Sequence, residues 1–114
     1  MEDKLLFLWN ILETGEDKII IKAIEEMSEL SQVLCKCLGG DERHPHIAEE
    51  LTDVEIMLEQ LHIIFEERHE DFKIECEVAR RYKLDRQKKR ISKLSQVRKD
   101  NEPGHEEHSL LSEL

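Results

Sequence analysis

Two groups of carboxylates lie close together in the chain and could jointly bind a divalent cation. The first group lies in the segment EEMSE and the second in EELTD, and their acidic members are Glu25, Glu26, Glu29, Glu49, Glu50 and Asp53. Residues three apart on a helix share a face. Glu26 would therefore project with Glu29, and Glu50 with Asp53.

Four carboxylates at the edge of a core would repel one another and lose hydration, and a bound cation would relieve both effects. Oxygen ligands without Cys or His favour Mg²⁺, Mn²⁺ or Ca²⁺ over Zn²⁺. Two solvated acidic faces would explain the same pattern, because 39% of the residues are charged.

The elements that must position these carboxylates are helices. Apolar spacing and chain breakers predict helices at about residues 2–13, 16–38, 45–70 and 72–97, with Gly39-Gly40 ending the second. Four Gly and two Pro are too few for a β-sandwich or barrel. We therefore expect an all-α fold, a helical bundle of about four helices, with one domain at residues 1–99 and a mobile acidic tail at residues 100–114.

The apolar residues predict which helix faces are buried. The predicted stripe of the second helix is Ile20, Ala23, Met27, Leu30, Leu34 and Cys37, and that of the third is Ile47, Leu51, Val54, Leu58, Leu61 and Phe65. If the two helices pack antiparallel, as their short loop suggests, the carboxylates beside the stripes could converge. Further apolar residues on other sides of the third helix predict contacts with more than one neighbour, and hence an oligomer.

The charge of the chain is segregated. Residues 1–76 carry 20 acidic and 7 basic residues, residues 77–99 carry 2 and 10, and residues 100–114 carry 5 and none. The overall acid excess argues against nucleic acid as a partner. Lys83 and Arg86 in the basic segment are candidates for phosphate contacts, although a basic face paired with acidic groups is the alternative. Trp9 and Tyr82 could stack on a base, but a lone Trp on an apolar stripe is more often part of a core.

The segments IEEMSEL and EELTDVEIMLEQL resemble the MazG-like nucleotide pyrophosphohydrolases of the all-α NTP pyrophosphatase superfamily. The family pattern is E-E-x-x-E, a loop, and then E-x-x-D. The resemblance covers about residues 16–66 well and the fourth helix loosely. Related sequences often carry an Asn with the basic residues of a downstream helix, whereas here no Asn precedes Asn101 in that helix.

The resemblance implies Mg²⁺-dependent hydrolysis of a (d)NTP to the (d)NMP and pyrophosphate, with Mn²⁺ as a substitute metal. It implies Glu26, Glu29, Glu50 and Asp53 as metal ligands, and a homodimer or homotetramer with the active site bordered by two subunits. Two acids, Glu25 and Glu49, are candidates for activating water or for supporting the ligands. Lys22 could contact phosphate or pair with Glu26, and we favour pairing.

A non-enzymatic helical interaction module that dimerises through the third helix is the alternative function. A scaffold would not need the four carboxylates, and this feature separates the two hypotheses. The sequence shows no secretion signal and no apolar run long enough to span a membrane, so we expect no membrane partner. Three cysteines do not form a disulfide framework, and reduced thiols predict a cytoplasmic location.

Overall fold

A computed structural model describes residues 2–101, which form four helices and no strand. The helices are α1 (Glu2–Thr14), α2 (Glu16–Leu38), α3 (His44–Arg68) and α4 (Phe72–Asn101). The predicted all-α fold is confirmed, and the helix bounds agree with the prediction to within two residues, except that α4 continues to Asn101. The first two residues of the predicted tail are therefore helical, and the rest of the tail lies outside the described residues.

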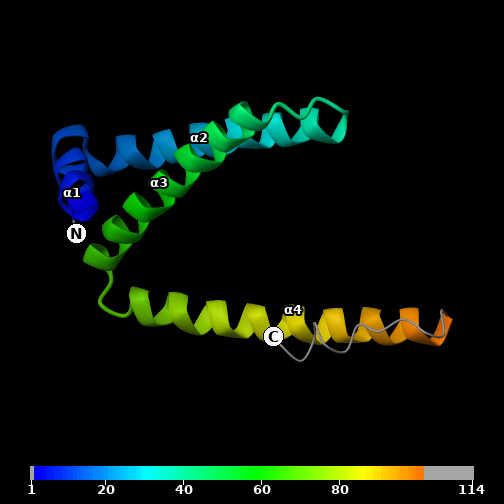
Figure 1. Ribbon diagram of the computed structural model, residues 1–114. Coiled ribbons are helices and arrows are strands. Elements are labelled where there is room, and N and C mark those ends of the chain that lie inside the picture. Colours follow the sequence, from blue (N-terminus) through cyan, green and yellow to red (C-terminus); the bar gives the residue numbers. More distant parts are fainter. Residues whose placement is uncertain (1, 102–114) are drawn as a thin grey trace. The chain divides into compact units, whose positions relative to one another are not determined.

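The chain divides into two compact units, Met1–Phe72 and Lys73–Leu114. We call the first unit the three-helix body, because it consists of α1, α2 and α3. Within it, α2 and α3 run in opposite directions from the turn that joins them (Figure 1). This confirms the antiparallel packing expected from the short loop, and it brings the middle of α2 beside the start of α3.

Glycines separate the first three helices. Gly15 has φ 96°, a backbone conformation that side chains disfavour, and its N–H donates to the carbonyl of Ile11 at 2.8 Å. The N–H of Gly39 donates to the carbonyls of Cys35 and Lys36 and so ends α2. Pro45 lies in the first turn of α3, where a missing N–H is tolerated.

The core of the three-helix body draws on all three helices. It contains Ile11 from α1, Ile19 and Ala23 from α2, and Met57 and Ile64 from α3. Apolar contact among these residues orients α2 and α3 and so places the carboxylates that they carry.

The predicted apolar stripes were partly wrong. The predicted members Ala23 and Val54 are buried, but the other buried positions are Ile19, Glu26 and Val33 on α2 and Met57, Gln60 and Ile64 on α3. The predicted members Met27, Leu34, Leu51 and Leu58 are exposed. Each helix is therefore turned slightly from its predicted orientation. On α2, Glu26 is buried and the predicted stripe member Met27 beside it is exposed.

The helix α4 carries the basic residues of the second unit. Lys83, Arg86, Gln87 and Arg90 line a hollow of about 230 Å³ on it. The guanidinium of Arg86 lies 5.8 Å from the centre of the Tyr82 ring, within the range of a cation–π contact. No helix in residues 2–101 has a stretch long and apolar enough to cross a membrane.

Candidate metal centre

Three of the predicted carboxylates converge where α2 and α3 face each other. Glu26 and Glu29 come from the middle of α2, and Glu50 comes from the early turns of α3. Each side chain offers one carboxylate oxygen, and these three oxygens lie within 4.8 Å of one another. We call Glu26, Glu29 and Glu50 the carboxylate cluster.

The carboxylate cluster extends from the interior of the three-helix body to its surface. Glu26 is only 7% exposed, and the side chain of Glu50 is 13% exposed, whereas Glu29 is exposed. The cluster is therefore anchored on buried Glu26 and largely buried Glu50 and is open to solvent on the Glu29 side, so that a ligand could approach it.

Each of the two buried carboxylates has one oxygen beside a basic group and one oxygen without a partner. Lys22 Nζ lies 3.0 Å from Glu26 Oε1, and His46 Nε2 lies 3.6 Å from Glu50 Oε1. Glu26 Oε2 and Glu50 Oε2 are buried and have no hydrogen-bond partner within residues 2–101. Buried polar atoms are nearly always paired in folded proteins, so two unpaired carboxylate oxygens at one place require an explanation.

The pKa values show that the local positive charge does not neutralise the cluster. The negative charge of Glu26 raises the pKa of Glu29, burial and the charge of Glu50 raise it further, and Lys22 acts in the opposite direction. The hydrogen bond and charge of Glu26 raise the pKa of Lys22. The cluster therefore carries excess negative charge that favours a cation or a proton.

The cluster has the chemistry of a site for a hard divalent cation. It offers carboxylate oxygens only, which suits Mg²⁺ or Mn²⁺. A cation among Glu26, Glu29 and Glu50 would give the two unpaired oxygens a partner and would offset the repulsion that raises the pKa of Glu29. Mg²⁺ often keeps several waters and takes its remaining ligands from substrate phosphates, which fits a cluster of three carboxylates with one open side.

Asp53 is not part of the carboxylate cluster. It is exposed and lines a shallow hollow of about 370 Å³ with Ala48, Glu49 and Thr52. The buried face of α3 passes through Val54, so Asp53 lies one residue to the side of that face. The structure thus brings together three of the four predicted ligands.

The two acids considered for water activation line different hollows. Glu49 shares the shallow hollow with Asp53. Glu25 is exposed, with its carboxylate 4.0 Å from Lys22 Nζ, and both residues line a separate hollow of about 450 Å³. Lys22 is therefore placed between Glu25 and Glu26, and it pairs with the latter as the sequence predicted.

The contact between His46 and Glu50 was not predicted. The two residues are four apart on α3, a spacing that puts side chains on one face of a helix, so the signal was present in the sequence. The burial of Gln60 was not predicted either; this residue is 2% exposed and accepts a hydrogen bond from Asn10 Nδ2 at 2.7 Å. Lys83 and Arg86 belong to the second unit, where they line the hollow on α4.

Comparison of the chain with protein-family models, with curated proteins and with solved structures gives no match in any of the three.

Proposed function

We propose that the chain is a MazG-like, Mg²⁺-dependent nucleoside triphosphate pyrophosphohydrolase, which converts a (d)NTP and water to the (d)NMP and pyrophosphate. One observation carries the proposal: Glu26, Glu29 and Glu50 bring carboxylate oxygens within 4.8 Å of one another, and Glu26 and Glu50 each have one buried oxygen with no hydrogen-bond partner among residues 2–101. These residues belong to the two motifs on which the family resemblance depends.

Glu26, Glu29 and Glu50 would hold Mg²⁺, or Mn²⁺ as a substitute. Asp53 is proposed as the fourth ligand, because residues three apart on a helix share a face and its side chain could turn toward Glu50. The bound cation would stabilise the negative charge that develops on the phosphate oxygens during hydrolysis.

The other residues act on the water and the phosphates. Water attacks the α-phosphorus, the bond to the β-phosphate oxygen breaks, and pyrophosphate leaves. Glu25 is our first candidate for orienting that water and accepting its proton, because it lines a hollow beside the cluster, and Glu49 is the second. Lys22 holds Glu26 in place, and we assign phosphate contacts to Lys83 and Arg86, which line the basic hollow on α4.

We further propose that the enzyme acts as a homodimer or homotetramer in the cytoplasm. The three-helix body exposes large apolar side chains on all of its helices, among them Leu12, Ile21, Ile24 and Leu38. Exposed apolar surface of this kind is typical of protein interfaces. The three cysteines are free thiols, which fits a reducing compartment.

The same exposed apolar residues are the observation that favours a non-enzymatic interaction module. A module of that kind gains nothing from two buried, unpaired carboxylate oxygens. The enzyme is therefore the better explanation of the site, and the interaction module is the better explanation only if the carboxylates prove to be dispensable.

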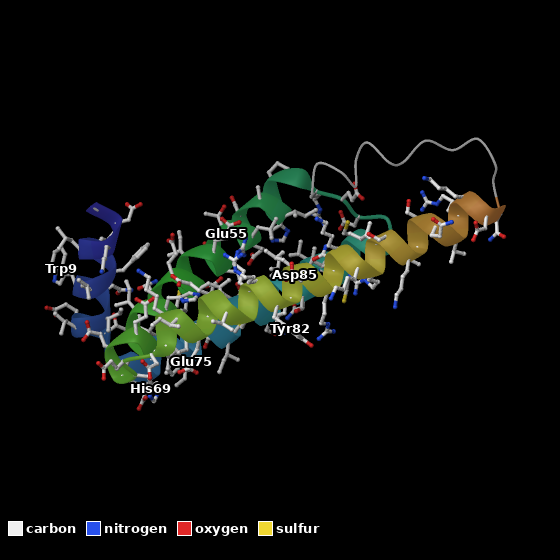
Figure 2. The ribbon with its side chains drawn as sticks, turned by 90° about the horizontal axis from the view of Figure 1, so that it is seen from below. Trp9, Glu55, His69, Glu75, Tyr82 and Asp85 are labelled. Carbon is white, nitrogen blue, oxygen red and sulfur yellow. The ribbon has the colours of Figure 1, made fainter. Side chains whose placement is uncertain are left out.

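The decisive experiment is to incubate the purified chain with Mg²⁺ and a panel of ribo- and deoxyribonucleoside triphosphates and to measure pyrophosphate. We expect release from at least one triphosphate, and loss of turnover in Glu26→Gln, Glu29→Gln and Glu50→Gln with the helical content retained. Glu55→Gln, a change of the same type on the surface of α3 (Figure 2), is the matched control and should be active.

Absence of pyrophosphate with every triphosphate would refute the enzyme, and orthophosphate alone would indicate a different hydrolase. Asp53→Asn tests the fourth ligand separately, because unchanged turnover in that variant would limit the site to three carboxylates. Sedimentation at micromolar concentration tests the oligomer, and a mass of one chain would contradict it.

A further inference from the structure

A groove between α1 and α3 is lined by an aromatic ring and by polar groups that could bind a planar heterocycle. It has a volume of about 410 Å³, and its lining residues include Trp9, Asn10 and Glu13 from α1 and Ile56 and Gln60 from α3. The indole of Trp9 on α1 (Figure 2) is 64% exposed, so it is not core, contrary to the usual place of a lone Trp. The groove therefore offers an aromatic face, an amide and a carboxylate from successive turns of one helix.

A chain of hydrogen bonds fixes the amide of Asn10 at this groove. Thr14 Oγ1 donates to Asn10 Oδ1 at 2.9 Å, and Asn10 Nδ2 donates to Gln60 Oε1 at 2.7 Å. Gln60 is 2% exposed, and its own Nε2 donates to the carbonyl of Ile56 at 3.5 Å. These bonds fix the orientation of the Asn10 amide. They leave one N–H donor and one acceptor lone pair free, and an amide can use such a donor and acceptor together to bind the edge of a base.

The groove is linked to the carboxylate cluster through a second hollow. That hollow has a volume of about 450 Å³ and is lined by Asn10, Lys22, Glu25 and Met57, among others. It shares Asn10 with the groove, and its Lys22 contacts Glu26 of the cluster. On α3, Glu50 and Ile56 are six residues apart, or about 9 Å along the helix axis. The sugar and phosphates of one nucleotide can span this distance.

We infer that the groove binds the base of the nucleotide whose phosphates occupy the carboxylate cluster, and that it selects bases with an exocyclic amino group. This inference rests on the proposed function. Trp9 stacks on the base, and the amide of Asn10 binds its edge. The carboxylate of Glu13 only accepts hydrogen bonds, so it favours an exocyclic amino group, which is N4 in cytosine, N6 in adenine and N2 in guanine, and disfavours the O2 and O4 carbonyls of uracil and thymine.

The selectivity is tested by comparing kcat/KM for dCTP, dATP and dGTP with that for dTTP and dUTP. We expect at least one amino-bearing substrate to be preferred by about fivefold or more, which is the low end for a well-formed contact between a side chain and a base edge. Glu13→Gln should reduce this preference toward one, mainly through KM, because an amide can also donate to a carbonyl. Asp3→Asn, a carboxylate-to-amide change at an exposed position of α1, is the matched control and should keep the preference.

A second readout does not depend on turnover, because Trp9 is the only tryptophan in the chain. With Mg²⁺, a dCTP analogue that cannot be cleaved between its α- and β-phosphates should change the Trp9 fluorescence saturably. Inorganic tripolyphosphate, which has the phosphates without a base, should not. An analogue that inhibits turnover without any change in fluorescence would overturn the inference.

The kinetic outcomes separate the two proposals. Pyrophosphate release from all bases with equal kcat/KM, or an unchanged preference in Glu13→Gln, would overturn the base site and leave the pyrophosphohydrolase intact. No pyrophosphate from any triphosphate would refute the pyrophosphohydrolase, and the base site with it.

Discussion

Replacing Glu50 with Gln should stabilise the metal-free protein and abolish its stabilisation by Mg²⁺. Glu26 and Glu50 are both largely buried, and each brings a carboxylate oxygen within 4.8 Å of the other's. At that distance, two unit charges repel by about 3 kcal/mol with an effective dielectric constant of about 20. Glu50→Gln removes this repulsion and adds an amide donor to the carboxylate cluster.

The free energy of unfolding without metal should therefore rise by about 1–3 kcal/mol, since part of the gain is lost with the contact between His46 and Glu50. For a unit the size of the three-helix body, this corresponds to a rise in Tm of at least about 4 °C. The wild-type protein should instead gain about 4.1 kcal/mol when Mg²⁺ is present at about 1,000 times its Kd, and Glu50→Gln should gain little. The order of stability should therefore reverse between EDTA and Mg²⁺.

Thermal unfolding followed by circular dichroism and by Trp9 fluorescence, each with EDTA and with Mg²⁺, measures this reversal. Trp9 lies in α1 and so reports on the three-helix body. Glu55→Gln should shift neither melting curve, because Glu55 is exposed. A Glu50→Gln protein that melts below wild type in EDTA, or equal stabilisation of both proteins by Mg²⁺, would contradict this prediction.

Three further predictions use other parts of the three-helix body. Folding raises the pKa of Glu29, so its contribution to stability is complete below the ordinary Glu pKa and is lost as pH rises through the raised value. The free energy of unfolding, measured in urea without metal, should therefore fall over this pH range, and Glu29→Gln should make that fall smaller. The hydrogen bond to Glu42 raises the pKa of Cys37, so mass spectrometry should find Cys37 alkylated more slowly than exposed Cys35. Glu42→Gln should bring the two alkylation rates closer together. Gly15→Ala should lower the free energy of unfolding, measured in urea, by about 1–2 kcal/mol, because Ala disfavours a φ of 96°; an added methyl group meets no neighbouring atom, so the backbone alone causes the loss. Gly39→Ala, at φ −82°, should lower the free energy of unfolding much less.

The helices could be predicted from the sequence because chain breakers mark their ends. Gly15 separates the first two helices, Gly39 ends α2, and Pro45 lies in the first turn of α3. These signals act within a few residues and do not depend on tertiary packing. The end of α4 was placed too early, because nothing in the chain stops a helix between Val97 and Asn101.

The buried faces of α2 and α3 were harder to predict, because apolar residues surround both helices. Ile19, Ile20 and Ile21 are consecutive, and each begins a plausible stripe. Local spacing cannot choose between them, since only the fit against α1 and α3 decides which one enters the core. The structure buries Ile19 and leaves Ile21 exposed.

The choice of the wrong stripe on α2 has the same physical origin as the candidate site. A stripe that begins at Ile19 and continues through Ala23 reaches Glu26, and reasoning from hydrophobicity rejects a stripe that contains a carboxylate. The protein nevertheless buries Glu26 and sets Glu50 against it from α3, although a core of apolar residues would be more stable. Both helices thus bury a carboxylate where a core would favour an apolar side chain, and they do so at the point where they meet. This is typical of a ligand site, because a bound ligand offsets the unfavourable burial of charge. The repulsion between Glu26 and Glu50 is thus the property that would make the metal-free protein bind a divalent cation.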